Sequence, residues 1–156
     1  MHRGYNKEKF IQKVDMIRDI IPDVSLTTDI IVGFPGESED NFTETLDVMN
    51  EIKFDSAFNF KYSPRRGTKA SEYDDQIPEE VKKHRLKRVI DLQREHTLLN
   101  NLNLVGTVED VLVEKESKMS NKQWAGRTDS NKWIIFDKED SHIGDMKSIK
   151  ITKARG

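Results

Sequence analysis

The fold is decided by the stretch Leu26-Thr-Thr-Asp-Ile-Ile-Val-Gly-Phe-Pro-Gly-Glu37. Residues 26–32 are rich in β-formers and nearly continuously apolar towards their end, which is typical of a strand covered on both faces. Gly33 and Gly36 then break the strand, and Ser38 is a good N-cap for a helix. The stretch therefore predicts a strand, a tight turn and a helix.

Helical spacing appears on both sides of this stretch. Upstream, Asn6 is a candidate N-cap and Pro22 a stop, which predicts a helix between them. Its apolar residues fall on one face: Phe10, Val14, Ile17 and Ile21. The helix that begins after Ser38 has its own apolar stripe: Phe42, Leu46 and Met49. Both helices should pack against the strand through these faces.

A second strand follows over residues 56–62, where apolar and polar residues alternate: Phe58, Phe60 and Tyr62 with Ala57, Asn59 and Lys61. A strand, a helix and a strand in this order predict a parallel βαβ unit. The carboxyl ends of parallel strands carry the ligand site in such folds, so we expect it at the loops Gly33–Glu37 and Ser63–Thr68.

The rest of the chain predicts one long helix and then a small all-β domain. Pro78 suits the first turn of a helix running to about Leu99. Its candidate inward residues are Val81, Leu86, Val89 and Ile90. Four short β segments follow: residues 108–114, 123–128, 132–136 and 147–152. Asp129-Ser130-Asn131 forms a predicted hairpin turn between the middle pair.

Composition limits the possible functions. The chain has 156 residues, 26 Lys and Arg against 28 Asp and Glu, and a formal net charge of −2, so any site for a polyanion must be local. It has no cysteine, which excludes disulfides and cysteine-bound clusters within this polypeptide. No apolar run could span a bilayer and no signal peptide is evident, so we expect a cytoplasmic protein without a membrane role. The four histidines share no metal-ligand spacing, so no metal site is expected.

Three motifs resemble one family in the same order. They are the stretch at 27–37 quoted above, Phe60-Lys-Tyr-Ser-Pro-Arg-Arg-Gly-Thr68, and Met1-His-Arg-Gly-Tyr5. Together they resemble radical S-adenosylmethionine methylthiotransferases, and most closely the MiaB type, which adds a methylthio group to isopentenyl-adenosine beside the tRNA anticodon. The β-rich tail resembles the TRAM domain with which these enzymes hold tRNA. The likeness covers essentially the whole chain.

The resemblance implies an architecture and a set of contacts. Residues 1–77 would be the carboxyl-terminal half of a parallel (β/α) barrel, residues 78–103 a connecting helix, and residues 104–156 an OB-like TRAM barrel lacking its last strand. The open strand edge would favour aggregation. The residues expected to contact S-adenosylmethionine are Gly33, Phe34, Pro35, Gly36, Glu37, Arg65 and Arg3.

Charge and aromatic residues on the tail hairpin predict a surface for tRNA. The candidates are Arg127, Lys132, Trp124 and Trp133. Cations would bind phosphates and indoles would stack on bases, whereas the alternative for the two tryptophans is core packing. For the Gly33–Glu37 loop the alternative is a purely structural turn, and for Arg65 an exposed loop cation.

The family also uses two 4Fe-4S clusters, held by cysteines in an amino-terminal domain and a Cys-x-x-x-Cys-x-x-Cys loop that this sequence lacks. We therefore expect both ends of the chain to be truncated, no catalytic residue within it, no tightly bound cofactor and no activity of the chain alone. Its partners would be tRNA and the absent cluster-bearing domains. Two alternatives remain: a separate tRNA-binding module, or part of an enzyme acting on threonylcarbamoyl-adenosine or a ribosomal protein.

Overall fold

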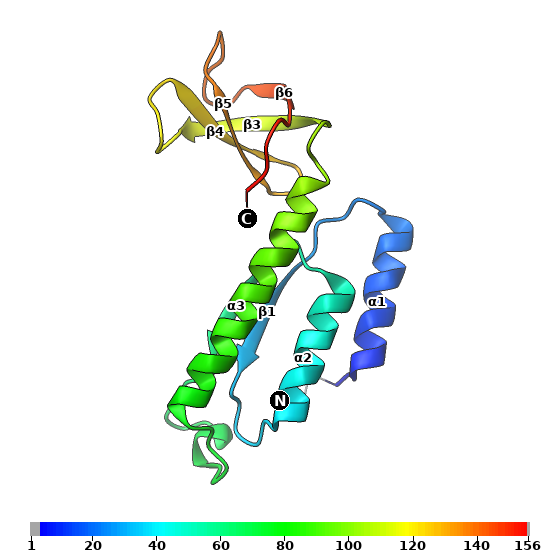
Figure 1. The fold of residues 1–156 in the computed structure, drawn as a ribbon, viewed down its shortest axis with the longest axis vertical. Coiled ribbons are helices and arrows are strands. Elements are labelled where there is room, and N and C mark those ends of the chain that lie inside the picture. The colour runs from blue at the N-terminus through cyan, green and yellow to red at the C-terminus, as the bar shows by residue number, and fades with distance from the viewer. Residues whose placement is uncertain (1–3, 156) are drawn as a thin grey trace. The chain divides into compact units, whose positions relative to one another are not determined.

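The computed structural model describes residues 4–155 and divides them into two compact units. The first ends at Asn100 and the second spans Asn101–Arg155 (Figure 1). The boundary falls near the end of a long helix.

The first unit contains the predicted helices and strands. In chain order these are α1 (Lys7–Ile20), β1 (Thr27–Val32), α2 (Glu39–Ile52), β2 (Ser56–Lys61), the 3-10 helix η1 (Lys69–Glu72) and α3 (Glu79–Leu102). The two strands are parallel, with Thr27 opposite Ser56 and Val32 opposite Lys61. The parallel βαβ unit predicted from the sequence is therefore confirmed.

Side-chain caps fix where the first two helices begin. The Asn6 side chain accepts a hydrogen bond from the Lys9 amide (3.1 Å), as predicted. Ser38 and Asn41 form a reciprocal capping box: each side chain accepts from the other's backbone amide, at 3.1 and 3.2 Å. These bonds satisfy amides that the first turn of a helix leaves unpaired.

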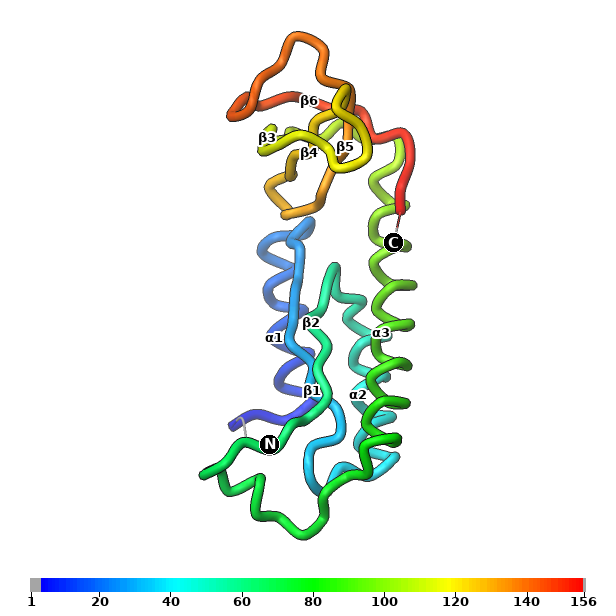
Figure 2. Tube along the Cα trace, turned by 90° about the vertical axis from the view of Figure 1, so that its left-hand side faces the viewer, coloured from blue at the N-terminus to red at the C-terminus, as the bar shows by residue number. Residues whose placement is uncertain are grey.

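The core of the first unit lies on one side of the strands. Ile30 and Val32 pack there with Phe42 and Met49 of α2 and Val89 of α3. Figure 2 shows α2 and α3 on the same side of β1 and β2. The expectation that the first strand is covered on both faces is wrong: Ile31 is 39% exposed, because among residues 4–155 the helices cover one face of the sheet.

The aromatic side of β2 is exposed as well. Phe58 is 66% and Phe60 51% exposed, and the pairing of Phe60 with Ile31 places these side chains on the same open face. Two residues of the predicted apolar face of the first helix are exposed as well: Ile17 of α1 is 41% exposed, and Ile21, directly after α1, is 54% exposed. Among residues 4–155, the buried residue of α1 is Val14.

The buried stripe of α3 is mostly polar, which the sequence pattern did not predict. Its members are Lys82, Arg85, Val89, Gln93 and His96. Of the predicted inward residues, Val89 is buried, whereas Val81 is 37% exposed. Because Val89 belongs to the core of the first unit, α3 packs as one of its helices along much of its length.

Polar side chains of α3 bind the backbone between α2 and β2. Gln93 Nε2 donates to the Phe54 carbonyl (2.8 Å), and Thr97 Oγ1 to the Asp55 carbonyl (2.9 Å). Asn100 donates to the carbonyl of Lys53, the left-handed residue (φ 53°) that ends α2. These bonds satisfy carbonyls where the chain leaves regular structure.

The second unit is a curled antiparallel sheet with the strand order β5-β4-β3-β6. Its strands are β3 (Val108–Glu116), β4 (Gln123–Thr128), β5 (Trp133–Asp137) and β6 (Met146–Lys150). All four predicted strands are present, and residues 129–131 form the turn between β4 and β5. The register shifts between Val113 and Lys115, which marks a β-bulge in β3.

Within the described residues, no helix is both long enough and apolar enough to cross a membrane.

Candidate functional site

Two loops meet at the carboxyl-terminal edge of the parallel strands, as expected from the topology. One is Gly33–Glu37 and the other follows Tyr62, whose amide donates to the Val32 carbonyl (2.8 Å). The ring of Phe34 meets that of Tyr62 edge-on, with centroids 5.1 Å apart. An aromatic pair therefore joins the first predicted loop to the residue directly before the second.

The Gly33–Glu37 loop contains a tight turn. The Glu37 amide donates to the Phe34 carbonyl (2.9 Å), with Pro35 and Gly36 at the two central positions. Proline followed by a residue with positive φ is typical of a type II turn, and Gly36 has φ +78°. The Gly36 amide is paired with the Asp75 carbonyl (3.0 Å), so this part of the loop is also fixed from outside.

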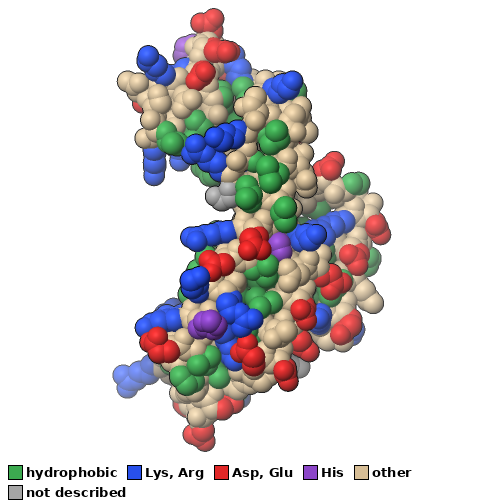
Figure 3. Space-filling view, viewed as in Figure 1, with side chains coloured by type: hydrophobic (Ala, Val, Ile, Leu, Met, Phe, Trp, Pro, Cys, Tyr) green, Lys and Arg blue, Asp and Glu red, His purple; other side chains and the backbone are tan. Residues whose placement is uncertain are grey.

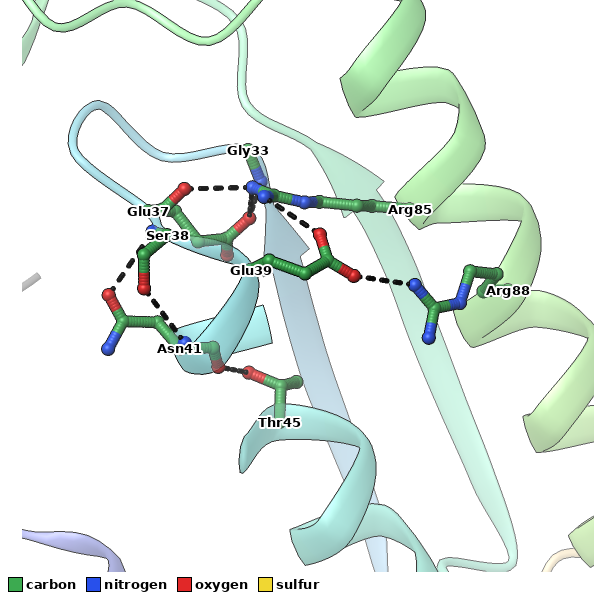
Figure 4. A network of polar contacts seen from close by, with 8 residues as sticks. All are labelled: Gly33, Glu37, Ser38, Glu39, Asn41, Thr45, Arg85 and Arg88. Carbon is green, nitrogen blue, oxygen red and sulfur yellow. Dashed lines mark hydrogen bonds and ion pairs between the residues drawn. The ribbon is translucent and has the colours of Figure 1, made fainter. Parts of the chain in front are cut away.

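The Glu37 carboxylate is the centre of a polar network (Figure 4). It accepts the Gly33 amide and Arg85 Nη1, both at 2.7 Å. Arg85 Nη1 also donates to the Glu37 carbonyl (2.9 Å), and Arg85 Nη2 to Glu39 (3.1 Å). The side chains of Arg85 and Glu37 are 6% and 11% exposed, so this ion pair is largely shielded from water.

Glu39 extends the network to the surface. Arg88 Nη1 donates to it at 2.8 Å, from a side chain that is 40% exposed. The hydrogen bond from Arg88, and after it that from Arg85, lower the pKa of Glu39 below its usual value. The loop and the start of α2 are therefore held by two arginines of α3.

Neither glycine of this loop leaves an open space for a ligand. A Cβ on Gly33, which has φ +72°, would lie 2.3 Å from Lys82 Cγ, and one on Gly36 would lie 2.4 Å from an Asp75 oxygen. The side chains of Lys82 and Asp75 already occupy the positions that a side chain at Gly33 or Gly36 would take. A side chain at either glycine would therefore collide with Lys82 or Asp75.

Arg65 and Arg3 are the remaining residues predicted to contact the cofactor. Arg65 is exposed on the loop after β2, where its carbonyl accepts the amide and the hydroxyl of Thr68 at 3.1 and 2.8 Å. Arg3 lies outside the described residues. The network described above does not include Arg65.

The residues present do not fit an iron–sulfur cluster. The sequence has no cysteine, and within residues 4–155 no group of three or more His, Asp or Glu side chains could hold a metal ion. No chemical step is therefore assigned to a cluster in this chain.

The second unit presents an aromatic side chain between two cations. Trp133 is 50% exposed, with Lys115 Nζ 4.1 Å and Arg127 Cζ 5.2 Å from its ring centroid. Arg127 lies directly opposite Trp133 on β4, and it donates to Glu114 (2.6 Å) and Asn131 (2.7 Å). Cation–π contacts of this kind preorganise both partners.

Apolar side chains on the same face of the sheet surround this group. Leu112, Ile135 and Met146 are 41%, 47% and 62% exposed, and the strand register places them on the side of Arg127. We refer to the following residues as the Trp133 face: Leu112, Lys115, Arg127, Trp133, Ile135 and Met146. Such a mixture of apolar, aromatic and cationic side chains is suited to a partner that has both planar rings and negative charge.

The other two predicted RNA-binding residues are placed differently. Trp124 is 9% exposed and its indole donates to the Ser141 carbonyl (3.2 Å), so core packing describes it. The Lys132 amide donates to Thr128 Oγ1 (3.1 Å), and Lys132 Nζ lies 3.5 Å from Asn101 Oδ1. Of the four, the structure brings Arg127 and Trp133 together.

Sequence reasoning missed Arg85, Lys82 and Lys115. The partners of Arg85 lie more than forty positions upstream in the chain, and the Tyr62 carbonyl near Lys82 lies twenty positions upstream, so no local pattern pairs them. Lys115 reaches Trp133 by way of the bulge in β3, and an irregular register cannot be read from alternation. The sequence did offer one signal for this surface. The hairpin turn predicted at residues 129–131 places Trp133 opposite Arg127.

Comparisons with known proteins agree with the fold of the second unit. Residues 103–156 match the TRAM domain family, so the second unit is a TRAM domain. The chain is 46% identical over 155 residues to a tRNA-2-methylthio-N(6)-dimethylallyladenosine synthase of Carboxydothermus hydrogenoformans, covering 99% of this chain and 35% of that protein.

Enzymes of the same name from other bacteria match over the same extent. The identity is 48% for that of Moorella thermoacetica and 41% for that of Aquifex aeolicus, over 99% of this chain and 35% and 34% of those proteins. The predicted resemblance to MiaB-type methylthiotransferases is thereby confirmed. The chain spans about a third of the length of these curated relatives.

Proposed function

We propose that this chain takes part in the methylthiolation of tRNA, on an adenosine that carries an isopentenyl (dimethylallyl) group beside the anticodon. The observation that carries the proposal is the 46% identity to a synthase of that product over 99% of the chain. In this role the parallel βαβ unit would belong to a (β/α) barrel and the TRAM domain would hold tRNA in the cytoplasm.

The chain alone would not perform the reaction. It has no cysteine for a cluster. Cluster-bearing regions that supply S-adenosylmethionine cleavage and sulfur would have to come from other polypeptide. Arg65 and the open sheet face with Phe58 and Phe60 are exposed and could contact a substrate.

A chimaeric enzyme tests the catalytic part of this proposal. Residues 4–155 replace the matching region of the Moorella thermoacetica relative, and the tRNA product is digested and analysed by mass spectrometry. We expect 2-methylthio-N(6)-isopentenyladenosine from the chimaera and none from the chain alone. A chimaera that binds its clusters but methylthiolates only a threonylcarbamoyl-adenosine or a protein substrate would favour the corresponding alternative.

The Trp133 face is our candidate for the tRNA contact. Each base stacked on an aromatic side chain contributes about 1–3 kcal/mol, and Trp133 offers an exposed indole for this purpose. Arg127 and Lys115 lie beside it for the phosphates, although Glu114 neutralises part of the charge of Arg127. Affinity should therefore depend on stacking at least as much as on charge.

The overall charge supports only weak general attraction. Residues 104–156 carry 10 Lys and Arg against 9 Asp and Glu, a net of +1. Acidic and basic side chains are interspersed over the side of the first unit seen in Figure 3. With about two phosphates neutralised at a slope of −0.7 each, affinity should fall about sevenfold between 50 and 200 mM salt.

Filter binding of tRNA to the whole chain tests this surface. We expect Trp133→Ala to weaken binding by about tenfold through lost stacking. The double variant Arg127→Ala, Lys115→Ala should also weaken binding and should flatten the salt dependence. A double variant of α1, Lys9→Ala with Lys13→Ala, removes the same charge elsewhere and should bind as the parent does. Equal binding by all variants would exclude the hairpin as the RNA surface.

A separate tRNA-binding module is the second candidate, and the absence of cysteine favours it. It predicts tRNA binding through the Trp133 face together with an inactive chimaera.

A further inference from the structure

Two buried cations of α3 contact the Gly33–Glu37 loop from the same side. Lys82 and Arg85 are 6% and 5% exposed and lie one helical turn apart. Arg85 binds the carboxylate and the carbonyl of Glu37. The stem of Lys82 packs against Gly33, and its ammonium group lies 3.4 Å from the Tyr62 carbonyl. One turn of helix thus reaches both loops at the edge of the sheet.

Burial of these cations requires specific partners. A charge removed from water is costly unless it is paired, and breaking such a pair leaves the remaining charge uncompensated. Arg85 has three oxygen partners within 3.1 Å: the carbonyl and carboxylate of Glu37 and the carboxylate of Glu39. Lys82 Nζ lies 3.5 Å from Glu79, at the start of the same helix. The loop conformation that provides these partners is therefore strongly favoured over others.

The Gly33 amide is tied to the same group. It donates to the oxygen of Glu37 that also accepts from Arg85, so two donors share one carboxylate oxygen. Because Gly33 has positive φ and no space for a Cβ, its backbone can adopt this position only as glycine. The glycine, the acid and the two cations form one set of mutually dependent contacts.

We infer that Lys82 and Arg85 are positioning residues that preset the Gly33–Glu37 loop, so that Gly33 and Glu37 serve this packing and not the approach of a ligand. The loop then has the same shape with and without a bound molecule. Ligand contact at this edge falls to Phe34, whose ring already rests on Tyr62, and to the open face of the sheet. This inference stands on contacts within the chain and goes beyond the proposed function.

Hydrogen exchange at a single amide tests the role of Arg85. In the ¹⁵N-labelled chain, the Gly33 amide should be protected by its bond to Glu37. We expect Arg85→Met to reduce this protection at least about tenfold relative to the Met49 amide in α2, because the carboxylate loses its partner. Arg85→Lys keeps one charged donor and should retain part of the protection. Normalising to α2 separates a loop effect from a general loss of stability.

Arg88→Met is the matched control for this measurement. Arg88 lies on the same helix and binds Glu39, but its side chain is 40% exposed and does not reach Glu37. Its removal should leave the protection of Gly33 unchanged. Equal effects of the two arginine variants, or none from Arg85→Met, would overturn the inference. So would protection of the Gly33 amide that rises markedly when S-adenosylmethionine is added.

A second-site rescue tests the role of Lys82 independently. Gly33→Ala should raise the unfolding equilibrium constant, because its Cβ meets Lys82 Cγ and its φ is strained. Adding Lys82→Ala removes the collision and leaves the φ strain, so the double variant should be more stable than Gly33→Ala alone. Urea unfolding followed by circular dichroism measures both. If the two substitutions are merely additive, Lys82 does not determine the need for glycine.

Discussion

The two units of this chain use cations in opposite ways. In the first unit, Arg85 is buried and its partners belong to the chain itself. In the second, Arg127 has a side chain that is 41% exposed and lies beside a half-exposed tryptophan. In the first unit, where Arg85 is buried, an apolar side chain is exposed instead: Phe58, on the open face of the sheet, is 66% exposed.

This contrast shows that residue type alone does not identify a binding site. Glu37 and its arginine would attract notice as functional charges in a loop at a strand end, yet their bonds account for the shape of that loop. Arg127 has the commoner surface environment of an arginine, and its position next to Trp133 is what suggests a ligand. Substitutions in the two units should therefore differ in kind as well as in size.

The largest effect on stability should come from Trp124, which is buried in the second unit although Trp133 of the same unit is half-exposed. Trp124 is buried in the second unit, so Trp124→Ala should cost about 3–5 kcal/mol of stability. Trp133→Ala removes a half-exposed ring and should cost far less while weakening tRNA binding. Urea unfolding followed by the amide resonances of β3 and β4 measures both. Comparable losses would mean that Trp133 is a core residue.

A smaller effect should come from a buried polar group in the first unit. Gln93→Leu keeps the volume roughly constant but leaves the Phe54 carbonyl without its donor, at a cost of about 1–3 kcal/mol. Arg94→Leu, at the adjacent position with a side chain 74% exposed, is the control and should change stability little. Helix circular dichroism during urea unfolding reports the difference. Equal values would show that α3 does not depend on its polar stripe.

The cap of α2 should have a more modest effect. Ser38→Ala removes the acceptor for the Asn41 amide and should cost about 1 kcal/mol. Ser38→Gly should cost only a few tenths of that amount, since glycine is itself tolerated at this position. Thermal unfolding of the two variants beside the parent measures the cap, and a larger loss for glycine would contradict the assignment.

The smallest effect should be a dependence of stability on pH. Burial lowers the pKa of His96 below its usual 6.5, with a further contribution from Lys53. The folded chain thus favours neutral imidazole, and stability should be complete above about pH 6.5 and decline as the pH falls from there towards the folded-state pKa. His96→Gln should reduce this decline, and His84→Gln, at an exposed position of the same helix, should preserve it.

Local signals in the sequence predicted much of this fold. The caps at Asn6 and Ser38 and the hairpin turn at residues 129–131 involve neighbours three or four positions apart, so their chemistry is visible in the sequence. The parallel pairing of β1 with β2 followed from one long crossover. The aromatic and cationic character of the tail hairpin was also visible before the fold was known.

What the sequence did not predict depends on distant partners. Lys82, Arg85 and Gln93 occupy the buried stripe of α3 because distant groups supply their bonds: the Tyr62 carbonyl twenty positions away, Glu37 forty-eight and the Phe54 carbonyl thirty-nine. Polar residues at helical spacing would otherwise indicate a solvated face. The prediction that both faces of β1 are buried was wrong for a related reason. Burial of a strand face depends on which distant elements cover the sheet.

The bulge in β3 has a consequence for the sign of the charge beside Trp133. It places Lys115 opposite Ala125, on the strand side that also carries Arg127. With regular pairing after Val113, Glu114 would take that position, and Lys115 would move opposite Trp124 on the other side of the sheet. One extra residue in a strand thus sets whether an ammonium group or a carboxylate neighbours the indole. Related chains could reverse their preference between anionic and cationic ligands by gaining or losing this irregularity, without changing any residue of the hairpin itself.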